Sequence, residues 1–190
     1  LIPFLVTRQI IVGAGKITKN ALDIQVEGPG FFPLQLLYGQ IGYTRDGQFK
    51  KDPQGRIVDK NGNPLQPEIV IPPNAAGIDI SGNGTVSATV GNSMVPQVIG
   101  QIQLVNFVNP AGLKAMGKNV FMPSGSSGLP VQGQPGLNGL GELAQGQVEA
   151  SNVNIVDEMV NMITAQRAYE TNSKVIQASD QMLQSVNQLR

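Results

Sequence analysis

The sequence predicts a mainly β protein with one long C-terminal α-helix. Turn-forming residues recur from position 21 to about position 148 and separate short extended runs. That pattern is typical of a compact β-domain, sandwich-like or barrel-like, with many short strands. From Asn154 to Arg190 the chain contains neither Pro nor Gly, and Ala, Met, Gln, Glu and Leu are common. Such a composition predicts a single extended helix.

The composition excludes several classes of protein. The 190 residues include 13 basic and 13 acidic side chains, so no net charge marks a nucleic-acid partner. His and Cys are both absent, which removes the imidazole base, the thiolate nucleophile, the disulfide and the usual zinc site. No stretch reaches the roughly 20 apolar residues of a membrane span. We expect no cofactor, no bound metal, no nucleic acid and no direct insertion into a membrane.

Residues 1–20 are expected to form an N-terminal arm or connector. Residues 1–11 are apolar, but they include Pro3 and Arg8 and are not followed by a small-residue cleavage site. A buried strand or a packing arm is therefore favoured over a signal peptide.

Residues 21–150 are expected to form the β-rich domain. Leu22, Ile24 and Val26 alternate with polar residues, as the side chains on one face of a strand do. Residues 97–108 are rich in β-branched and aromatic side chains. These side chains occur at both even and odd positions, which predicts one strand with both faces at least partly covered. At the Asp46-Gly47 turn we expect Gly47 to need a positive φ.

Residues 123–141 differ in composition from the rest of this domain. Gly, Ser and Pro dominate, and neither a strand period nor a helix period survives, so the segment is expected to be a loop. Composition favours a flexible connector, and the alternative is an extended strap along a neighbouring subunit.

Residues 151–190 are expected to form the C-terminal helix. Ser151, Asn152 and Asn154 are candidate N-caps, and Asp157 with Glu158 complements the helix dipole in the first turn. At 1.5 Å per residue, about 36 residues give a rod about 50 Å long.

The apolar side chains of this helix fall into two stripes. At 100° per residue, the stripe of the second half lies nearly opposite the stripe of the first half. A helix that closed its own domain's core would keep one stripe, so the switch near residues 171–174 indicates two different partners. Bundling with neighbouring subunits is favoured over a helix folded back on the β-domain. The expected interface residues are Ile155, Met159, Met162, Ile163, Tyr169, Val175, Met182, Val186 and Leu189.

Four short motifs resemble binding, modification or catalytic sites, and each has a simpler structural explanation. Residues 13–16 (GAGK) lack the first Gly and the final Ser or Thr of a phosphate loop. The run from Asp59 begins like a calcium loop but lacks its central Gly, so a turn is favoured. Residues 83–85 match the glycan acceptor pattern, yet the flanking glycines favour a tight turn. Asp157 and Glu158 point about 100° apart on a helix, which does not suit shared catalysis. No catalytic constellation emerges.

Three blocks of residues occur in order along the chain. The first is GPGFF at 28–32, the second is YTRDGQF at 43–49, and the third joins SNVN at 151–154 to EMVNMITAQRAYE at 158–170. Together they resemble the rod and hook axial proteins of the bacterial flagellum, over residues 15–190. The residues that carry the resemblance in the β-domain and at the start of the helix are Gly28, Gly30, Phe31, Phe32, Tyr43, Thr44, Arg45, Asp46, Gly47, Phe49, Ser151, Asn152, Val153 and Asn154.

The resemblance implies a structural subunit, and no enzyme, that assembles helically with many copies of itself into a rigid hollow tube. Such a tube transmits torque to the hook and passes export substrates through its bore. The β-domain would form the outer wall, and the C-terminal helix would form the inner core with a preceding N-terminal helix outside this sequence. Hook proteins carry a large inserted domain between the second and third blocks, so the short interval here favours the branch that forms the distal rod.

The resemblance also implies partners and a location. Proximal rod and hook proteins would adjoin the ends of the tube, and the L and P rings would surround it. The tube would belong to the basal body, spanning the periplasm toward the outer membrane after export by the flagellar type III apparatus. A hook or proximal rod subunit is the alternative within the family. From a different class, the alternative is a β-domain enzyme or binding module on a trimerising helical stalk, but aromatic residues for sugar stacking make up only 5% of the chain.

Overall fold

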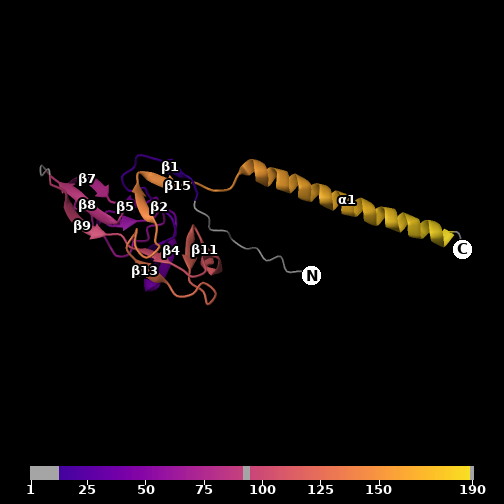
Figure 1. Cartoon of the computed structure of the whole chain (residues 1–190), viewed down its shortest axis with the longest axis horizontal. Helices are drawn as coiled ribbons and strands as arrows, with labels where there is room; N and C mark the ends of the chain where they lie inside the picture. The colour runs from indigo at the N-terminus through magenta and orange to yellow at the C-terminus, as the bar shows by residue number, and fades with distance from the viewer. Residues whose placement is uncertain (1–12, 92–94, 189–190) are drawn as a thin grey trace. The chain divides into compact units, whose positions relative to one another are not determined.

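The computed structural model describes residues 13–91 and 95–188, and it divides into two compact units (Figure 1). The first unit runs to Ser151 and contains short β-strands, and the second begins at Asn152 and contains α1 (Ile155–Gln188). The predicted class, mainly β with a long C-terminal helix, is confirmed. The strand or packing arm expected at residues 1–11 lies outside the described residues.

The described strands of the first unit are two to six residues long, and two single 3-10 turns accompany them. The bounds are β1 (Gly15–Ile17), β2 (Ile24–Glu27), β3 (Phe32–Gln35), η1 (Leu37–Gly39), β4 (Ile41–Thr44), β5 (Lys50–Lys51), β6 (Ile57–Val58), β7 (Ala75–Ile80), β8 (Thr85–Val90), β9 (Gln97–Gln101), β10 (Leu104–Asn106), η2 (Pro110–Gly112), β11 (Lys114–Gly117), β12 (Val120–Met122), β13 (Val131–Gly133), β14 (Glu142–Gln145) and β15 (Gln147–Glu149).

Within the described residues, the strands pair antiparallel in six small sheets. The largest has the order β11-β12-β4-β3, and β7-β8-β9 forms a sheet of three strands. The remaining pairs are β1-β15, β2-β14, β5-β6 and β10-β13. In the β1-β15 pair Gly15 lies opposite Glu149, and in the β2-β14 pair Val26 lies opposite Leu143. The first and last described strands of the first unit therefore lie side by side.

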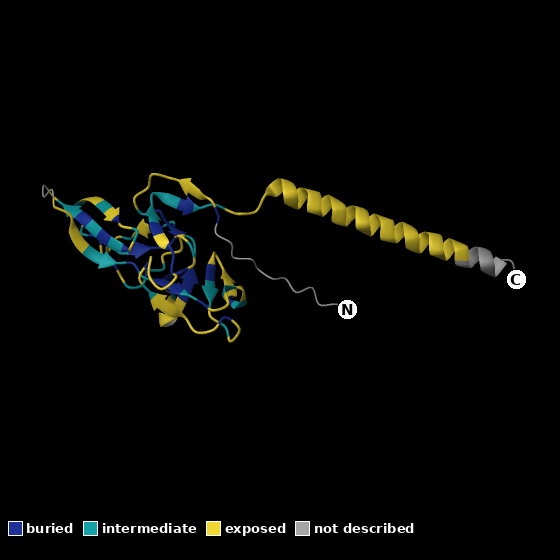
Figure 2. Ribbon diagram, in the orientation of Figure 1, coloured by how far each residue is buried: buried dark blue, intermediate teal, exposed yellow. Residues whose placement is uncertain are grey.

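Two clusters of buried side chains form the core of the first unit (Figure 2). The larger cluster draws aliphatic side chains and two Phe rings from eight strands and their loops: Ile24, Val26, Phe32, Leu34, Phe49, Ile57, Leu65, Ile69, Ile71, Ile80, Val86, Ile102, Leu104, Val120, Leu140 and Leu143. The smaller cluster is mainly aromatic: Phe31, Tyr43, Val105, Phe107 and Leu113. All of these residues lie between positions 24 and 143. The first unit therefore builds its core from its own strands and loops.

Strand β2 is buried on both faces, although its sequence alternates. Ile24 and Val26 are at most 1% exposed, and Gln25 between them is 4% exposed. Gly15 of β1 covers the polar side, because a Cβ built on it would come within 2.3 Å of Gln25 Oε1. The alternating pattern predicted a strand here correctly, but the polar face does not face water.

The single strand expected at residues 97–108 is wrong in its extent. β9 ends at Gln101 and β10 begins at Leu104, because the Ile102 N–H turns to donate to the Gly84 carbonyl at 2.7 Å. Apolar residues from Ile102 to Phe107 are buried, as expected for a strand covered on both faces. Val98 and Val108, at the two ends of the predicted strand, are exposed.

The expectation that residues 123–141 form a loop is wrong at residues 131–133. β13 lies inside this segment and pairs with β10, and Ser127 and Leu140 are buried. The Ser127 hydroxyl donates to the Ser124 carbonyl at 2.8 Å and accepts the Ser124 N–H at 2.9 Å, which closes a turn. β13 was not predicted because three residues are too few to show the alternation of a strand within a segment rich in Gly and Pro. A contact between this segment and a neighbouring subunit stays a prediction.

Helix α1 begins at a side-chain cap. The Asn154 Oδ1 accepts the Val156 N–H at 3.1 Å, and the Asn154 carbonyl accepts the Glu158 N–H at 3.1 Å. Asn154 is thus the N-cap among the three candidates, and Asp157 and Glu158 lie in the first turn as expected. The 34 residues of α1 correspond to about 50 Å at 1.5 Å per residue. No described helix is both long and apolar enough to cross a membrane.

Candidate assembly site

The side chain of Arg45, in the second sequence block, joins the first block to the end of β15. Its Nε lies 2.8 Å from Glu149 Oε2, and its Nη1 donates to the carbonyls of Gly28 at 2.9 Å and Gly30 at 3.1 Å. Gly28 and Gly30 both have positive φ, 123° and 144°, so the GPG turn has a shape that other residues rarely adopt. The rigid fork of one guanidinium therefore fixes this turn against the last strand of the unit.

Glu149 uses both of its carboxylate oxygens. Oε2 faces Arg45, and Oε1 accepts the Gly13 N–H at 2.9 Å. Next to it, the Ala150 N–H donates to the Ala14 carbonyl at 2.9 Å. The side chains of Arg45 and Glu149 are only 13% and 16% exposed, so water screens their attraction weakly. We call Arg45, Glu149 and Gly13 the clasp, because they hold the strands by which the chain enters and leaves the first unit.

Asp46 and Thr44 anchor the second block to the β11-β12 hairpin. Asp46 Oδ2 accepts hydrogen bonds from Lys60 Nζ at 2.9 Å and from Asn119 Nδ2 at 3.1 Å, and the Thr44 hydroxyl donates to the Asn119 carbonyl at 2.8 Å. Partial burial by itself raises the pKa of the Asp46 carboxyl. Hydrogen bonds from Lys60, Asn119 and the Gln48 N–H outweigh that effect, and the pKa lies below its ordinary value. Asp46 is therefore held ionised as part of the turn.

Position 47 requires Gly because the structure leaves no room there for a side chain. The expectation of a positive φ is wrong, since Gly47 is not among the glycines with positive φ. A Cβ built on Gly47 would lie 1.6 Å from the Ile24 carbonyl oxygen, and the Gly47 carbonyl accepts the Ile24 N–H at 2.9 Å. The backbone of the second block thus approaches β2 too closely for any side chain.

The aromatic residues of the first two blocks lie in the core. Phe31, Phe32, Tyr43 and Phe49 are at most 5% exposed. Phe32 and Phe49 meet edge to face with ring centroids 5.1 Å apart, and Tyr43 meets Phe107 in the same way at 4.9 Å. Burial raises the pKa of the Tyr43 hydroxyl. These rings stabilise the first unit and offer little surface to a partner.

The third block joins the two units. Ser151, Asn152, Val153 and Asn154 are all exposed, with Val153 at 57%. Asn154 caps α1, so this residue has a structural role in the described chain.

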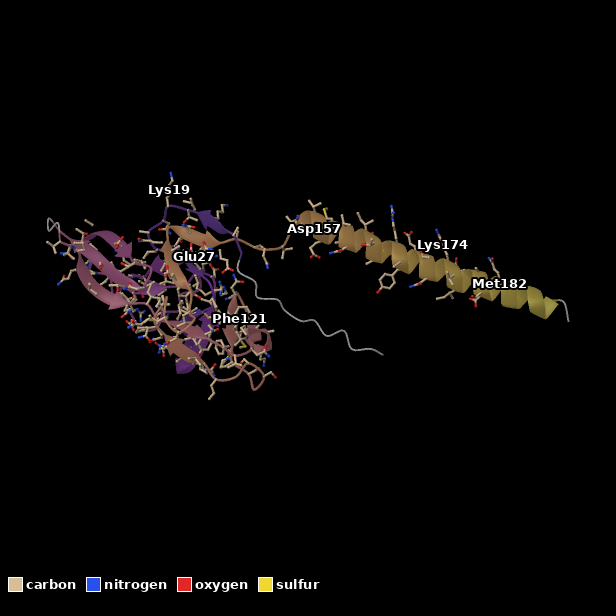
Figure 3. All side chains as sticks on the ribbon, viewed as in Figure 1. Lys19, Glu27, Phe121, Asp157, Lys174 and Met182 are labelled. Carbon is tan, nitrogen blue, oxygen red and sulfur yellow. The ribbon has the colours of Figure 1, made fainter. Side chains whose placement is uncertain are left out.

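Every side chain of α1 that the structure describes, from Ile155 to Met182, is exposed (Figure 2). Figure 3 shows Asp157, Lys174 and Met182 projecting from the helix. The large apolar side chains that are at least half exposed are Ile155, Val156, Met159, Val160, Met162, Ile163, Tyr169, Val175, Ile176 and Met182.

This set includes seven of the nine expected interface residues. The side chains of the other two, Val186 and Leu189, lie outside the described residues. The expected stripes did not include Val156, Val160 and Ile176, which widen the apolar surface beside them. Glu149 was not predicted either, because one Glu in a polar stretch forms no pattern of its own.

A polar depression of about 210 Å³ lies beside the second block, and Asp46, Asp59 and Lys60 are among the residues that line it. Its carboxylates are already engaged. Asp46 pairs with Lys60, and Asp59 Oδ1 accepts the N–H groups of Asn61 at 2.7 Å and Asn63 at 2.8 Å. The run from Asp59 is thus a turn, as predicted. Among the described residues, no three acidic side chains gather as a metal site would require. The candidate site therefore consists of a β unit that ion pairs and hydrogen bonds stabilise and a helix with an exposed apolar surface.

Comparison with known proteins relates these parts to two family models. The model described as flagellar hook protein FlgE/F/G D1 domain matches residues 25–88, and the model described as flagellar basal body rod FlgEFG protein C-terminal matches residues 144–189. The first match covers the clasp residue Arg45 and the GPG turn, and the second covers Glu149 and α1. The two matched regions therefore meet at the clasp.

Individual relatives cover more of the chain. Flagellar basal-body rod protein FlgG of Buchnera aphidicola subsp. Schizaphis graminum is 48% identical over 186 residues, which is 97% of this chain and 72% of that protein. The protein of the same name from Caulobacter vibrioides is 47% identical over 178 residues, 94% of this chain and 68% of that protein. Flagellar hook protein FlgE of Salmonella typhimurium is 40% identical over 119 residues, 63% of this chain and 29% of that protein.

Proposed function

The chain belongs to the family of flagellar rod and hook proteins as a structural subunit of the rod, and we propose that many copies of it assemble helically into the rigid, hollow distal rod. In this proposal the tube transmits torque to the hook and passes export substrates through its bore. A contact between different surfaces of successive copies that does not close into a ring generates such a filament. This role requires no reaction centre, and we propose that the protein is not an enzyme.

The exposed apolar surface of α1 carries the proposal. Both core clusters of the first unit lie within residues 24–143, whereas ten large apolar side chains of α1 are at least half exposed. Fully burying one such side chain is worth about 1.5–3 kcal/mol. A helix with so much exposed apolar surface gains most of its stability by packing against other helices. Neighbouring copies of the same helix would supply that surface in a tube.

We assign residues 21–150 to the outer wall of the tube, residues 151–190 to its inner core and residues 1–20 to the connection between them. The clasp supports this assignment. It holds Gly13 beside Glu149, so the chain that leads into the first unit and the chain that leads out to α1 are neighbours. In this proposal, a preceding N-terminal helix pairs with the C-terminal helix in the inner core.

The proposal extends to partners and location. Proximal rod and hook proteins would adjoin the two ends of the tube, and the L and P rings would surround it. The rod would span the periplasm toward the outer membrane after export of its subunits by the flagellar type III apparatus. The similarity to flagellar basal-body rod proteins supports placement in the basal body.

A hook or proximal rod subunit is the alternative within the family, and the relatives favour the rod. The rod proteins match over more than nine-tenths of this chain, and the hook protein matches over 63%. Gold-labelled antibody against the first unit, applied to basal bodies with attached hooks, separates these possibilities. We expect label on the distal part of the rod after the rings are removed, and label confined to the hook or to the proximal part of the rod would overturn the distal-rod assignment.

The alternative from another class is a β-domain enzyme or binding module on a trimerising helical stalk. Electron microscopy of the concentrated protein, at its full natural length, tests the two readings. We expect filaments or protofilaments, because the helix contacts propagate from copy to copy. Discrete trimers of uniform size would contradict the proposal and support the stalk.

A further inference from the structure

We propose that three methionines of α1, Met159, Met162 and Met182, are oxidation sites that control assembly. The inference rests on the proposed function, because oxidation at these positions matters if the helix becomes buried between subunits. All three thioethers are open to solvent in the single chain: Met159 is 58% exposed, Met162 is 59% exposed and Met182 is 64% exposed.

The three side chains are distributed over both apolar stripes of the helix. Met159 and Met162 belong to the stripe of the first half, which also contains Ile155. Met182 belongs to the stripe of the second half together with Val175. At 100° per residue, Met182 points about 140° away from Met159 around the helix axis. A change at the three sulfur atoms therefore alters both surfaces through which α1 is proposed to contact its neighbours.

The reaction with hydrogen peroxide requires nothing from the protein except access. A lone pair of the Met sulfur attacks one peroxide oxygen, the O–O bond breaks, and a sulfur–oxygen bond forms. The sulfur is oxidised by two electrons to the sulfoxide, the transferred hydroxyl group gives up its proton, and the other peroxide oxygen takes up this proton and leaves as water. The product is a polar, chiral side chain in place of a flexible apolar one.

Oxidation opposes burial of the helix. A sulfoxide oxygen is a strong hydrogen-bond acceptor, and burying it without a donor is unfavourable. Apart from Tyr169, the side chains expected along the stripes are aliphatic or Met side chains, which supply no donor. The free subunit is therefore the vulnerable form, whereas the assembled form covers the three thioethers and excludes the oxidant.

Met116 provides an internal comparison. It lies in β11 of the first unit and is 55% exposed, close to the exposure of the three helix methionines. Peroxide should oxidise Met116 at a similar rate in the free subunit. In the filament, oxidation at Met159, Met162 and Met182 should slow several-fold relative to Met116, as mass spectrometry of proteolytic peptides would report.

The deciding experiment treats full-length subunits with hydrogen peroxide, removes the oxidant, and measures the pelletable fraction under assembly conditions. We expect the oxidised protein to lose assembly several-fold. Treatment with both methionine sulfoxide reductases, which between them reduce the two epimers, should restore it. The triple variant Met159→Leu, Met162→Leu, Met182→Leu should assemble with or without peroxide, because Leu keeps the apolar surface and cannot be oxidised. Met116→Leu should stay as sensitive as the wild type.

Two results would overturn the inference while leaving the proposed function intact. In one, the oxidised wild-type protein assembles as well as the untreated protein. In the other, the triple Leu variant assembles before treatment and still loses assembly after it, which would assign the damage to another site. Untreated wild-type protein that never assembles would instead overturn the proposed function, and this inference with it.

Discussion

Arg45 Nε lies 2.8 Å from Glu149 Oε2, and this contact joins residues that are 104 positions apart in the sequence. The same guanidinium donates to the carbonyls of Gly28 and Gly30. The first and second sequence blocks thus meet the strand that leads to the third. The clasp gives a physical reason why these blocks occur together in one chain.

Arg45→Ala should destabilise the first unit by about 3–5 kcal/mol, because it leaves a shielded carboxylate without its partner. Urea denaturation followed by far-UV circular dichroism measures the change in the free energy of unfolding. Lys60→Ala is the matched control, since Lys60 Nζ lies 2.9 Å from Asp46 Oδ2 but the two side chains are 46% and 22% exposed. Exposed pairs contribute about 0–1 kcal/mol. Equal losses in the two variants would contradict the role given to the clasp.

Gly47→Ala should destabilise the first unit because its Cβ would collide with the Ile24 carbonyl oxygen at 1.6 Å. Relief of the collision requires the second block to move away from β2, at a cost of about 1–3 kcal/mol or more. Gly77→Ala serves as the control, since Gly77 lies in β7, has no positive φ and has no atom within 4 Å of the new Cβ. Its effect should stay within about 0.5 kcal/mol. A thermal melt of Gly47→Ala that matched the wild type would refute the steric argument.

The Asp46 carboxylate should contribute stability that depends on pH. Its pKa is lower in the folded protein than the ordinary value of 3.8. The contribution is therefore fully present above the ordinary value and is lost as the pH falls through the folded pKa. Asp46→Asn should destabilise the protein at pH 7, and the difference from the wild type should shrink below about pH 4. A difference that is the same at pH 7 and pH 3 would show that the charge of Asp46 is unimportant.

Local sequence patterns predicted the features that depend on neighbouring residues. The absence of Pro and Gly after Asn154 predicted α1, whose N-cap is Asn154. The turn at Asp59 was likewise predicted, because its carboxylate binds N–H groups two and four residues ahead.

Features that depend on distant residues were missed or explained wrongly. Gly47 is constrained by the carbonyl of Ile24, and Gln25 is buried because Gly15 covers it. Glu149 acquires its role from Arg45 across the unit. None of these relationships leaves a period or a spacing in the sequence, so no local pattern could reveal them. The resemblance to a family marked Arg45 and Gly47 as important without giving the physical reason.

The central claim is that the exposed apolar surface of α1 drives assembly of many copies, and Val175→Asp tests it most directly. Val175 is 58% exposed in the single chain, and a carboxylate buried there in the filament would cost several kcal/mol. The same replacement at Gln177 adds the same charge to the same helix about 160° away from Val175. Val186→Asp and Leu189→Asp, at the two expected interface positions beyond the described side chains, should behave as Val175→Asp does.

The measurement is the pelletable fraction of each full-length variant after ultracentrifugation under assembly conditions, with far-UV circular dichroism to verify that the first unit stays folded. We predict that Val175→Asp stays in the supernatant with a folded first unit, whereas Gln177→Asp pellets as the wild type does. Val175→Asp that pellets like the wild type would contradict the claim, and so would Val175→Asp that unfolds the first unit.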